Sequence, residues 1–255
     1  MIQAIILGSG TSTGVPMVGC GCHVCTSADK RDQRTRSSLL IRTGTAENIL
    51  IDTSTDLRQQ MIRERIGAVD AVLFTHTHAD HINGIDDLRG FHFIHKRLIS
   101  CYGSEETVHH LLATFPYIFK GRETPGYAPL LSAHTVTAPF DLFGCRITPL
   151  PLMHGPGCAT GYRINDLAYL TDCSGIPDST LELLNRLDIL IIDALRYTPH
   201  PGHFNITGAL EMIDRISPRR AILTHLTHEV PHADGIRLPS GVEFAYDGMI
   251  LEFNP

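Results

Sequence analysis

Four potential metal ligands, His76, His78, Asp80 and His81, directly follow the apolar segment 71–74. A short apolar run of this kind is typical of a buried strand, so the ligands lie at the end of that strand. Imidazole and carboxylate groups suit zinc, manganese and iron. The alternative is a histidine-rich surface turn without metal. Further ligands elsewhere in the chain favour the metal site.

Three more ligands end strand-like segments far along the chain. His154 follows the segment 147–153, Asp172 follows 167–171, and His225 follows 221–224. If these strands share one sheet, their ends converge. We therefore predict two ions, one held by His76, His78 and His154 and the other by Asp80, His81 and His225, with Asp172 bridging them. Such a pair, about 3.5 to 4 Å apart, stabilises attacking and leaving oxygens, which indicates a hydrolase.

The order of these ligands resembles the metallo-β-lactamase superfamily, whose hallmark is a His-x-His-x-Asp-His run followed by a separate His, Asp and His. The match spans nearly the whole chain. The resemblance implies an α/β fold, the four-layer αββα sandwich, with a binuclear metal site. It leaves the substrate open, because the superfamily includes lactamases, thioesterases, lactonases, nucleases and phosphodiesterases.

A second cluster, Cys20, Cys22 and Cys25, lies in a glycine-rich segment. Three thiolates at this spacing indicate a structural zinc ion, which needs a fourth ligand. His23 and His228 are the candidates. We prefer His228, because His23 lies within so short a loop that coordination strains it. Three ordinary reduced cysteines are the alternative.

The cysteine cluster adds a closer resemblance, to the phosphoribosyl cyclic phosphodiesterase branch of the carbon-phosphorus lyase pathway. The stretches that carry it are 8–16, 20–25, 76–81, Asp172, 224–228, 238–241 and 247–248. In that branch the three cysteines and the second histidine of the His-x-x-His pair hold a structural zinc, which implies Cys20, Cys22, Cys25 and His228 here. The resemblance also implies that His203 assists phosphodiester cleavage, although residues 199–202 differ from the branch.

The setting of His203 agrees with such a role. Ile206, Leu210 and Ile213 have helical spacing, and Asn205 is a good N-cap. We expect an exposed His203 near a helix N-terminus, where anions are favoured and where it can protonate a departing alkoxide. His200 is the local competitor, and a surface histidine without a catalytic role is the alternative.

These observations predict a phosphodiesterase that hydrolyses a small cyclic ribose phosphate or nucleotide-like phosphodiester. Metal-bound hydroxide attacks phosphorus, two zinc or manganese ions occupy the active site, and one zinc is structural. His203 assists the leaving group, and Asp80 contributes to catalysis by holding metal. The alternatives are an RNA hydrolase like the tRNA 3′-processing endonucleases and a noncatalytic metal or nucleotide binder.

Three further features near strand ends have open interpretations. Asp52 and Asp193 follow apolar segments and are expected to orient ligand imidazoles, unless they are simple turn residues. The glycine-rich segment 8–14 matches no nucleotide-binding pattern. It is either a phosphate-admitting or sugar-admitting loop beside the metals or a tight connection.

Charge argues against broad nucleic-acid binding, because 21 basic and 27 acidic residues leave a formal charge of −6. The basic cluster of Lys30, Arg31, Arg34 and Arg36 is expected to form a solvated face next to the zinc loop, and the alternative is contact with a phosphate. Seven cysteines do not form a disulfide pattern. The start of the chain has neither a secretory signal nor a membrane span, so we expect a cytoplasmic protein. General prevalence alone favours a homodimer.

The chain of 255 residues, 43% of them hydrophobic, is expected to form one hydrolase domain, 1–255, with a zinc loop at about 18–36. Helices are predicted at 55–66, 105–114 and 205–216. Residues 115–138 contain many prolines and glycines, which predicts a long loop or lid. In that segment Tyr117, Phe119 and Tyr127 either cover a substrate or pack the loop down.

Overall fold

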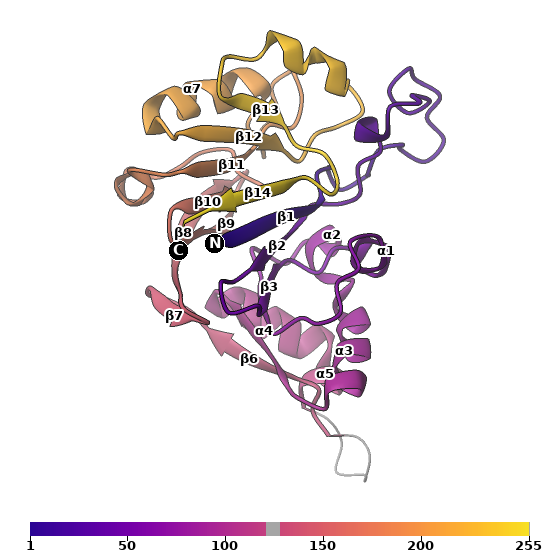
Figure 1. The fold of residues 1–255 in the computed structure, drawn as a ribbon, viewed down its shortest axis with the longest axis vertical. Coiled ribbons are helices and arrows are strands. Elements are labelled where there is room, and N and C mark those ends of the chain that lie inside the picture. Colours follow the sequence, from indigo (N-terminus) through magenta and orange to yellow (C-terminus); the bar gives the residue numbers. More distant parts are fainter. Residues whose placement is uncertain (121–127, 255) are drawn as a thin grey trace.

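The computed structural model describes residues 1–120 and 128–254, in which the strands form two seven-stranded sheets. The sheets face each other in the middle of the molecule (Figure 1). The first sheet has the order β14 (Ile250–Phe253), β1 (Ile2–Gly8), β2 (Ser38–Arg42), β3 (Asn48–Ile51), β4 (Ala71–Leu73), β5 (Ile99–Gly103) and β6 (Leu131–Thr135). The second has the order β13 (Val242–Phe244), β12 (Arg220–Thr224), β11 (Ile189–Asp193), β10 (Leu167–Leu170), β9 (Gly157–Ile164), β8 (Cys145–His154) and β7 (Phe140–Leu142).

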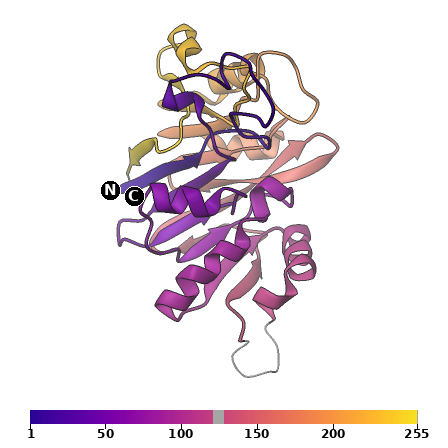
Figure 2. The same ribbon diagram turned by 90° about the vertical axis from the view of Figure 1, so that its right-hand side faces the viewer.

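Helices cover the outer face of each sheet, as the two ribbon views show (Figures 1 and 2). On the first sheet these are α1 (Leu57–Arg63), α2 (Ala79–Ile82), α3 (Leu88–His95), α4 (Glu105–Thr114) and α5 (Pro116–Phe119). The second sheet carries α6 (Asp178–Leu181) and α7 (Ile206–Ile216). Short 3₁₀ helices occupy Lys30–Asp32, Ile85–Asp87, Glu182–Leu184 and His232–Arg237. The predicted four-layer αββα sandwich is therefore confirmed.

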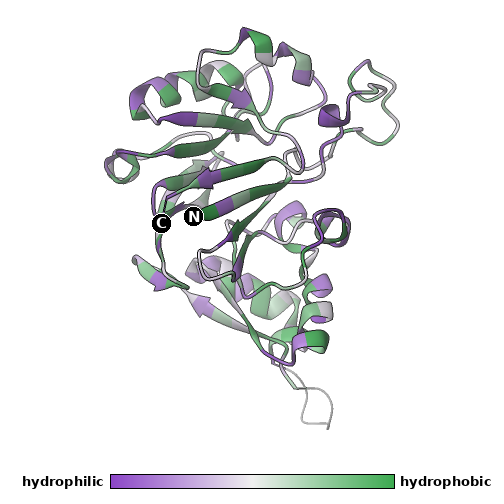
Figure 3. Cartoon of the chain, in the orientation of Figure 1, coloured by the Kyte–Doolittle hydropathy of each residue, from purple (hydrophilic) through white to green (hydrophobic). Residues whose placement is uncertain are grey.

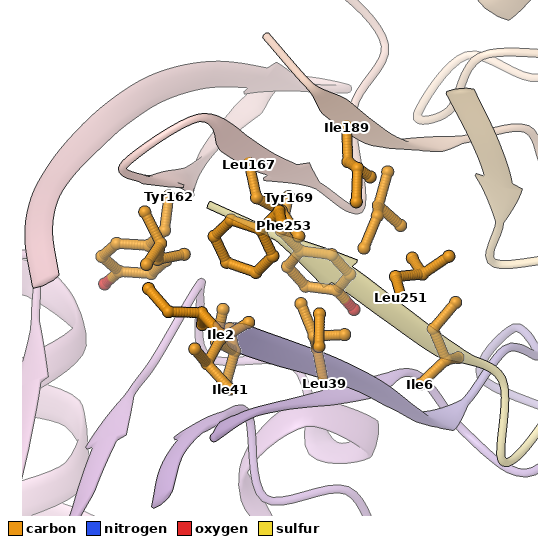
Figure 4. Close-up of a cluster of buried hydrophobic side chains, with 14 of the residues drawn as sticks. Ile2, Ile6, Leu39, Ile41, Tyr162, Leu167, Tyr169, Ile189, Leu251 and Phe253 are labelled. Atoms are coloured by element: carbon orange, nitrogen blue, oxygen red, sulfur yellow. The ribbon is translucent and has the colours of Figure 1, made fainter. Parts of the chain in front are cut away.

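The strands are apolar on both faces because both faces are covered. Within β2, Leu39 and Ile41 join the core between the sheets, whereas Leu40 packs under the helices of the first sheet. Tyr162, Tyr169 and their neighbours from the second sheet point toward the first sheet in that central core (Figure 4). Hydrophobic residues accordingly follow the strands, while hydrophilic ones lie mainly on helices and loops (Figure 3).

The parallel parts of the two sheets position the functional residues. Strands β3 to β6 run parallel in the first sheet. Strands β10 to β13 run parallel in the second. Carboxyl ends of parallel strands lie at one edge of a sheet, which is the usual place for binding sites in such folds. The residues after β3, β4, β10 and β12 therefore gather at neighbouring edges.

Helix predictions succeed where a capping residue is present. Helix α4 has the predicted bounds, with Ser104 as its N-cap. Helix α7 begins at Ile206, because the Asn205 side chain accepts a hydrogen bond from the backbone N–H of Gly208 at 2.9 Å. Helix α1 is shorter than the predicted 55–66.

The prediction of a long loop at 115–138 is wrong at both ends. Pro116 opens helix α5, a position that tolerates its missing N–H. Strand β6 pairs in parallel with β5, so tertiary hydrogen bonds override a weak local pattern. Phe119 is buried under the first sheet, and Tyr117 is exposed. Tyr127 lies outside the described residues, so the interpretation of that side chain is untested.

Among the residues that the structure describes, no helix is long and apolar enough to cross a membrane.

Candidate metal centre

The structure brings all seven predicted active-site ligands together at the strand ends. Candidate ligand atoms of His76, His78, His154 and Asp172 lie within 4.8 Å of one another. Those of Asp80, His81 and His225 form a second such group. Asp172 also reaches the second group, because its Oδ2 lies 3.1 Å from His81 Nε2 and its Oδ1 lies 3.4 Å from His225 Nε2. The geometry is that of two three-residue sites with a carboxylate between them.

Strained backbone at the strand ends sets this arrangement. Asp52 after β3, Asp172 after β10 and His225 after β12 have φ values of 62°, 53° and 60°. This left-handed region is unfavourable for residues other than glycine, at a cost of about 1–3 kcal/mol each. Such conformations persist where surrounding structure imposes them, and they cluster at functional sites.

The donor atoms fit divalent metal ions. The Nε2 atoms of His76, His81 and His225 are buried and have no hydrogen-bond partner among the described residues. A buried polar atom without a partner costs about 1–3 kcal/mol. Three such nitrogens beside the carboxylates of Asp80 and Asp172 are what a pair of cations would satisfy.

Electrostatics indicate the same need for positive charge. Burial alone lowers the pKa of His81, but the charges of Asp172 and Asp52 raise it well above its usual value. Burial alone raises the pKa of Asp172, but His225 and His81 hold it well below its usual value. The buried carboxylates of Asp52 and Asp172 therefore favour positive charge beside the His81 ring.

Partners behind the ligands fix the imidazole rings. Nδ1 of His81 donates to Asp52 Oδ2 at 2.7 Å, and Asp52 also accepts hydrogen bonds from the N–H and hydroxyl of Thr75. Nδ1 of His154 donates to the carbonyl of Gly202 at 2.8 Å. Each bond leaves Nε2 directed at the centre, as is usual for metal-binding histidines.

His203 lies beside the ligand cluster, and its exposure was predicted wrongly. Its side chain is only 12% exposed, because Nδ1 donates to the buried Asp193 Oδ2 at 2.7 Å and the ring stacks on that of His225. Burial alone lowers the pKa of His203, but the hydrogen bond and charge of Asp193 raise it above the usual value. This shift favours the doubly protonated ring, in which Nε2 also carries a proton.

His200 takes a more peripheral place. Its ring is exposed, and its Nδ1 accepts a hydrogen bond from the N–H of Gly202 at 3.2 Å. His203, but not His200, has a ring nitrogen within 4.8 Å of candidate ligand atoms of Asp172 and His225. This distance favours His203 as the residue that acts on a substrate at the metals.

A cavity of about 610 Å³ opens over the ligand cluster, with His200, His203 and Ser12 in its wall. Ser12 belongs to the glycine-rich segment 8–14. Close packing requires glycine at two positions of that segment, because a Cβ on Gly8 would lie 1.9 Å from the Arg36 carbonyl oxygen and one on Gly10 would lie 2.8 Å from that of Arg34. The segment is therefore a tight connection, and Ser12 lines the cavity.

The cysteine cluster meets the segment after β12. The Sγ atoms of Cys20, Cys22 and Cys25 lie 3.3, 3.4 and 3.5 Å from Nδ1 of His228, and the four donor atoms lie within 4.8 Å of one another. His23 is exposed and stands outside this group. No cysteine of the described chain forms a disulfide.

The thiols also need a cation. A hydrogen bond from the backbone N–H of Cys25 lowers the pKa of Cys22 to about 6. Burial and the neighbouring thiols raise the pKa of Cys25 to about 11. Adjacent thiolates repel one another, so all three ionise together only around a metal ion. A closed set of three sulfurs and one imidazole fits structural zinc.

The expected solvated basic face is wrong for Arg34. This side chain is buried, pairs with Asp32 at 3.3 Å, and donates from Nη1 to the Thr227 carbonyl at 3.0 Å. Asp32 in turn accepts from the N–H of His232 at 2.7 Å. The pair therefore fastens the cysteine loop to the segment that carries His228. Burial against another segment cannot be recognised from a local run of charges.

Sequence reasoning missed Glu106, which lies in the wall of the cavity at the metal centre. The sequence feature that could have identified Glu106 is its position at the start of a capped helix. That helix directly follows strand β5, at the same sheet edge as the ligands.

The chain is similar to several known proteins. Residues 47–226 match the family model described as Beta-lactamase superfamily domain. A solved structure described as a new diphosphatase from the PhnP family is 39% identical, with a TM-score of 0.92, and the match covers 100% of this chain and 98% of that one.

Two other matches are more limited in what they show. The octanoyltransferase of Porphyromonas gingivalis is 41% identical over 253 residues, which are 97% of this chain and 51% of that protein. The chain thus spans about half the length of this relative. The short form of human tRNase Z is 18% identical, with a TM-score of 0.74 and coverage of 99% and 100%, a likeness of fold alone.

Proposed function

Because the chain belongs to the metallo-β-lactamase superfamily, whose members are generally hydrolases, and resembles the PhnP family over its whole length, we propose that it is a metal-dependent phosphodiesterase. The proposed substrate is a small cyclic ribose phosphate or a nucleotide-like phosphodiester. The observation that carries the proposal is the position of Asp172 between two histidine-containing ligand groups, with His203 beside them.

The candidate ligands have different proposed roles. His76, His78 and His154 would hold one divalent ion and Asp80, His81 and His225 the other, with Asp172 shared. Bound zinc or manganese would activate a water molecule and offset the negative charge of the phosphate. A separate site, formed by Cys20, Cys22, Cys25 and His228, would hold a structural zinc ion, because its four donors leave no open position.

His203 supplies the proton that the leaving oxygen needs. Asp193 holds its Nδ1–H, so the ring presents Nε2 to the cavity over the ligands. Donation from Nε2 neutralises the departing alkoxide, a form of help that contributes about 10² to 10⁴ in rate. Phosphodiesters with poor leaving groups depend most on this proton.

A second candidate reaction is hydrolysis of a diphosphate bond, which the description of the 39% identical PhnP-family protein favours. The same ligands and the same proton donor serve both reactions, because attack in each case occurs at phosphorus. The octanoyltransferase activity of the Porphyromonas relative is not carried over, since the match covers 51% of that protein. RNA processing has weaker support, because a protein with a net charge of −6 repels the phosphate backbone of a large RNA.

A substrate panel tests the proposal. Protein loaded with zinc or manganese is assayed on bis(p-nitrophenyl) phosphate, cyclic ribose phosphates, nucleoside diphosphate esters and a precursor tRNA. We expect turnover of the small phosphate esters and none of the tRNA. Absence of turnover of every phosphodiester and diphosphate, in protein that contains its metals, would rule the proposal out.

A further inference from the structure

A chain of hydrogen bonds behind the candidate metal ligands joins one residue of each ligand group. His76 belongs to the first group and His81 to the second. Nδ1 of His76 lies 2.9 Å from the hydroxyl oxygen of Thr75, and that oxygen lies 2.7 Å from Oδ2 of Asp52. Nδ1 of His81 lies 2.7 Å from the same carboxylate oxygen. One carboxylate therefore stands behind a histidine of each group.

The single proton of the Thr75 hydroxyl sets the direction of this chain. A carboxylate can only accept, so the hydroxyl donates its proton to Asp52. No proton is left for His76, and Nδ1 of that ring must be the donor in the bond between the two residues. Because a neutral imidazole carries one N–H, Nε2 of His76 keeps its lone pair. That nitrogen is buried without a hydrogen-bond partner among the described residues, and it is the atom that a metal ion needs.

Burial leaves the Thr75 hydroxyl without a substitute. The residue is 1% exposed, so solvent does not reach it. The second sheet holds the backbone at this point. The carbonyl of Phe74 accepts the hydroxyl of Tyr162 at 2.7 Å, and the carbonyl of Thr75 accepts the N–H of Thr160 at 2.8 Å. The segment is therefore held in place, and removal of the hydroxyl alone would leave Nδ1 of His76 without its acceptor.

Thr224 provides an internal comparison. It too is a buried threonine directly before a candidate metal ligand, His225. The hydroxyl of Thr224 and Nδ1 of His225 both lack a hydrogen-bond partner in the described part of the chain. The Thr-His pair thus occurs at the ends of β4 and β12, and of the two hydroxyls that of Thr75 alone supports a ligand ring.

Resting on the proposed function and its metal ligands, we propose that Thr75 is a positioning residue that selects the metal-binding tautomer of His76. Without the hydroxyl, the neutral ring is free to carry its proton on Nε2, and this form cannot bind a metal ion. Asp52 positions His81 directly and His76 through Thr75. Loss of the hydroxyl therefore weakens the ion at His76, whereas loss of the Asp52 charge weakens both active-site ions.

Metal binding by Thr75→Val and Thr75→Ser tests the inference. Valine replaces the hydroxyl by a methyl group of similar size, and serine keeps the hydroxyl. Titration of zinc against a chelating indicator, with elemental analysis of the total metal content, gives the dissociation constant of each ion. For the valine variant we expect one active-site ion to bind about 10- to 100-fold more weakly, the usual cost of losing a partner behind a ligand imidazole. The serine variant should bind both ions as tightly as the wild type.

Asp52→Asn tests the shared carboxylate. An amide has one donor and one acceptor head, so it cannot accept both the N–H of Thr75 and Nδ1–H of His81. Both active-site ions should bind more weakly to this variant. The matched control is Thr224→Val, which removes a buried hydroxyl that has no partner among the described residues and should leave both affinities unchanged. Circular dichroism and thermal unfolding establish that each variant is folded.

The outcomes separate the inference from the proposed function. The inference is overturned if Thr75→Val or Asp52→Asn binds both ions as tightly as the wild type. It is also overturned if Thr75→Ser or Thr224→Val weakens binding as much as Thr75→Val does. In each of these cases the phosphodiesterase proposal stands, because it depends on bound metal and not on how the tautomer is selected. If the wild-type protein takes up no ion besides the structural zinc, both fail.

Discussion

Asp193 Oδ2 accepts a hydrogen bond from Nδ1 of His203 at 2.7 Å, and the other oxygen of the same carboxylate lies 3.9 Å from Nδ1 of His225. One buried carboxylate at the end of β11 therefore faces both the proposed proton donor and a proposed metal ligand. The arrangement couples the orientation of the proton donor to that of the ligand.

Replacing His203 by alanine should leave the metal content unchanged and reduce kcat on esters with poor leaving groups by about 10² to 10⁴, because the departing alkoxide loses its proton source. The loss should be much smaller for p-nitrophenyl esters. Steady-state kinetics on a ribose cyclic phosphate and on bis(p-nitrophenyl) phosphate make the comparison. His200→Ala is the matched control, and near-normal turnover of the cyclic phosphate by the His203 variant would contradict the assignment.

Asp193→Asn should lower activity by about 10- to 100-fold, the usual cost of losing a carboxylate behind a functional imidazole. The effect should not add to that of His203→Ala, because both variants disable the same proton donor. A double-mutant cycle on a poor leaving group measures this. Full additivity of the two changes would show that Asp193 acts through another residue.

Asp172→Asn should reduce the active-site metal content, because this carboxylate reaches ligands in both groups. Elemental analysis after dialysis, together with activity after chelation and after return of zinc or manganese, provides the measurement. Asp141→Asn, at an exposed site on β7, serves as a control. An unchanged metal content in the Asp172 variant would count against the shared ligand.

Cys20→Ser should lower the zinc content by about one ion per chain, because a closed four-ligand site loses one thiolate. It should also lower the thermal midpoint of unfolding, since metal binding contributes to folding. Cys158→Ser, which alters an exposed thiol outside the cluster, should leave the zinc content as it is. If dialysed protein holds two metal ions or fewer and Cys20→Ser changes nothing, there is no third site.

Arg34→Met should destabilise the fold by about 3–5 kcal/mol, because Asp32 is left buried without its charged partner. Urea unfolding measures the loss. Arg31→Met, which removes an exposed cation that pairs with Asp29, should change the free energy of unfolding by less than about 1 kcal/mol. Equal effects of the two substitutions would mean that the buried pair has no special role.

Much of the fold and the candidate site could be predicted locally. Apolar runs marked the strands that precede His76, Asp172 and His225, and a cap residue marked the start of α7. Other features depended on distant partners. Strand β6 forms because β5 offers it hydrogen bonds, and Arg34 is buried because segment 227–232 packs over it.

By itself the sequence determined the donors, since residue types at strand ends specify which atoms can bind metal. The grouping was predicted on the condition that the strands share an edge, and only the tertiary structure met that condition, because the facing sheets bring residues after β4 beside residues after β10 and β12. It also decided the hydrogen-bond partners behind the imidazole rings. The physical reason is that ligand chemistry belongs to single side chains, whereas burial and proximity arise from packing between segments far apart in the chain.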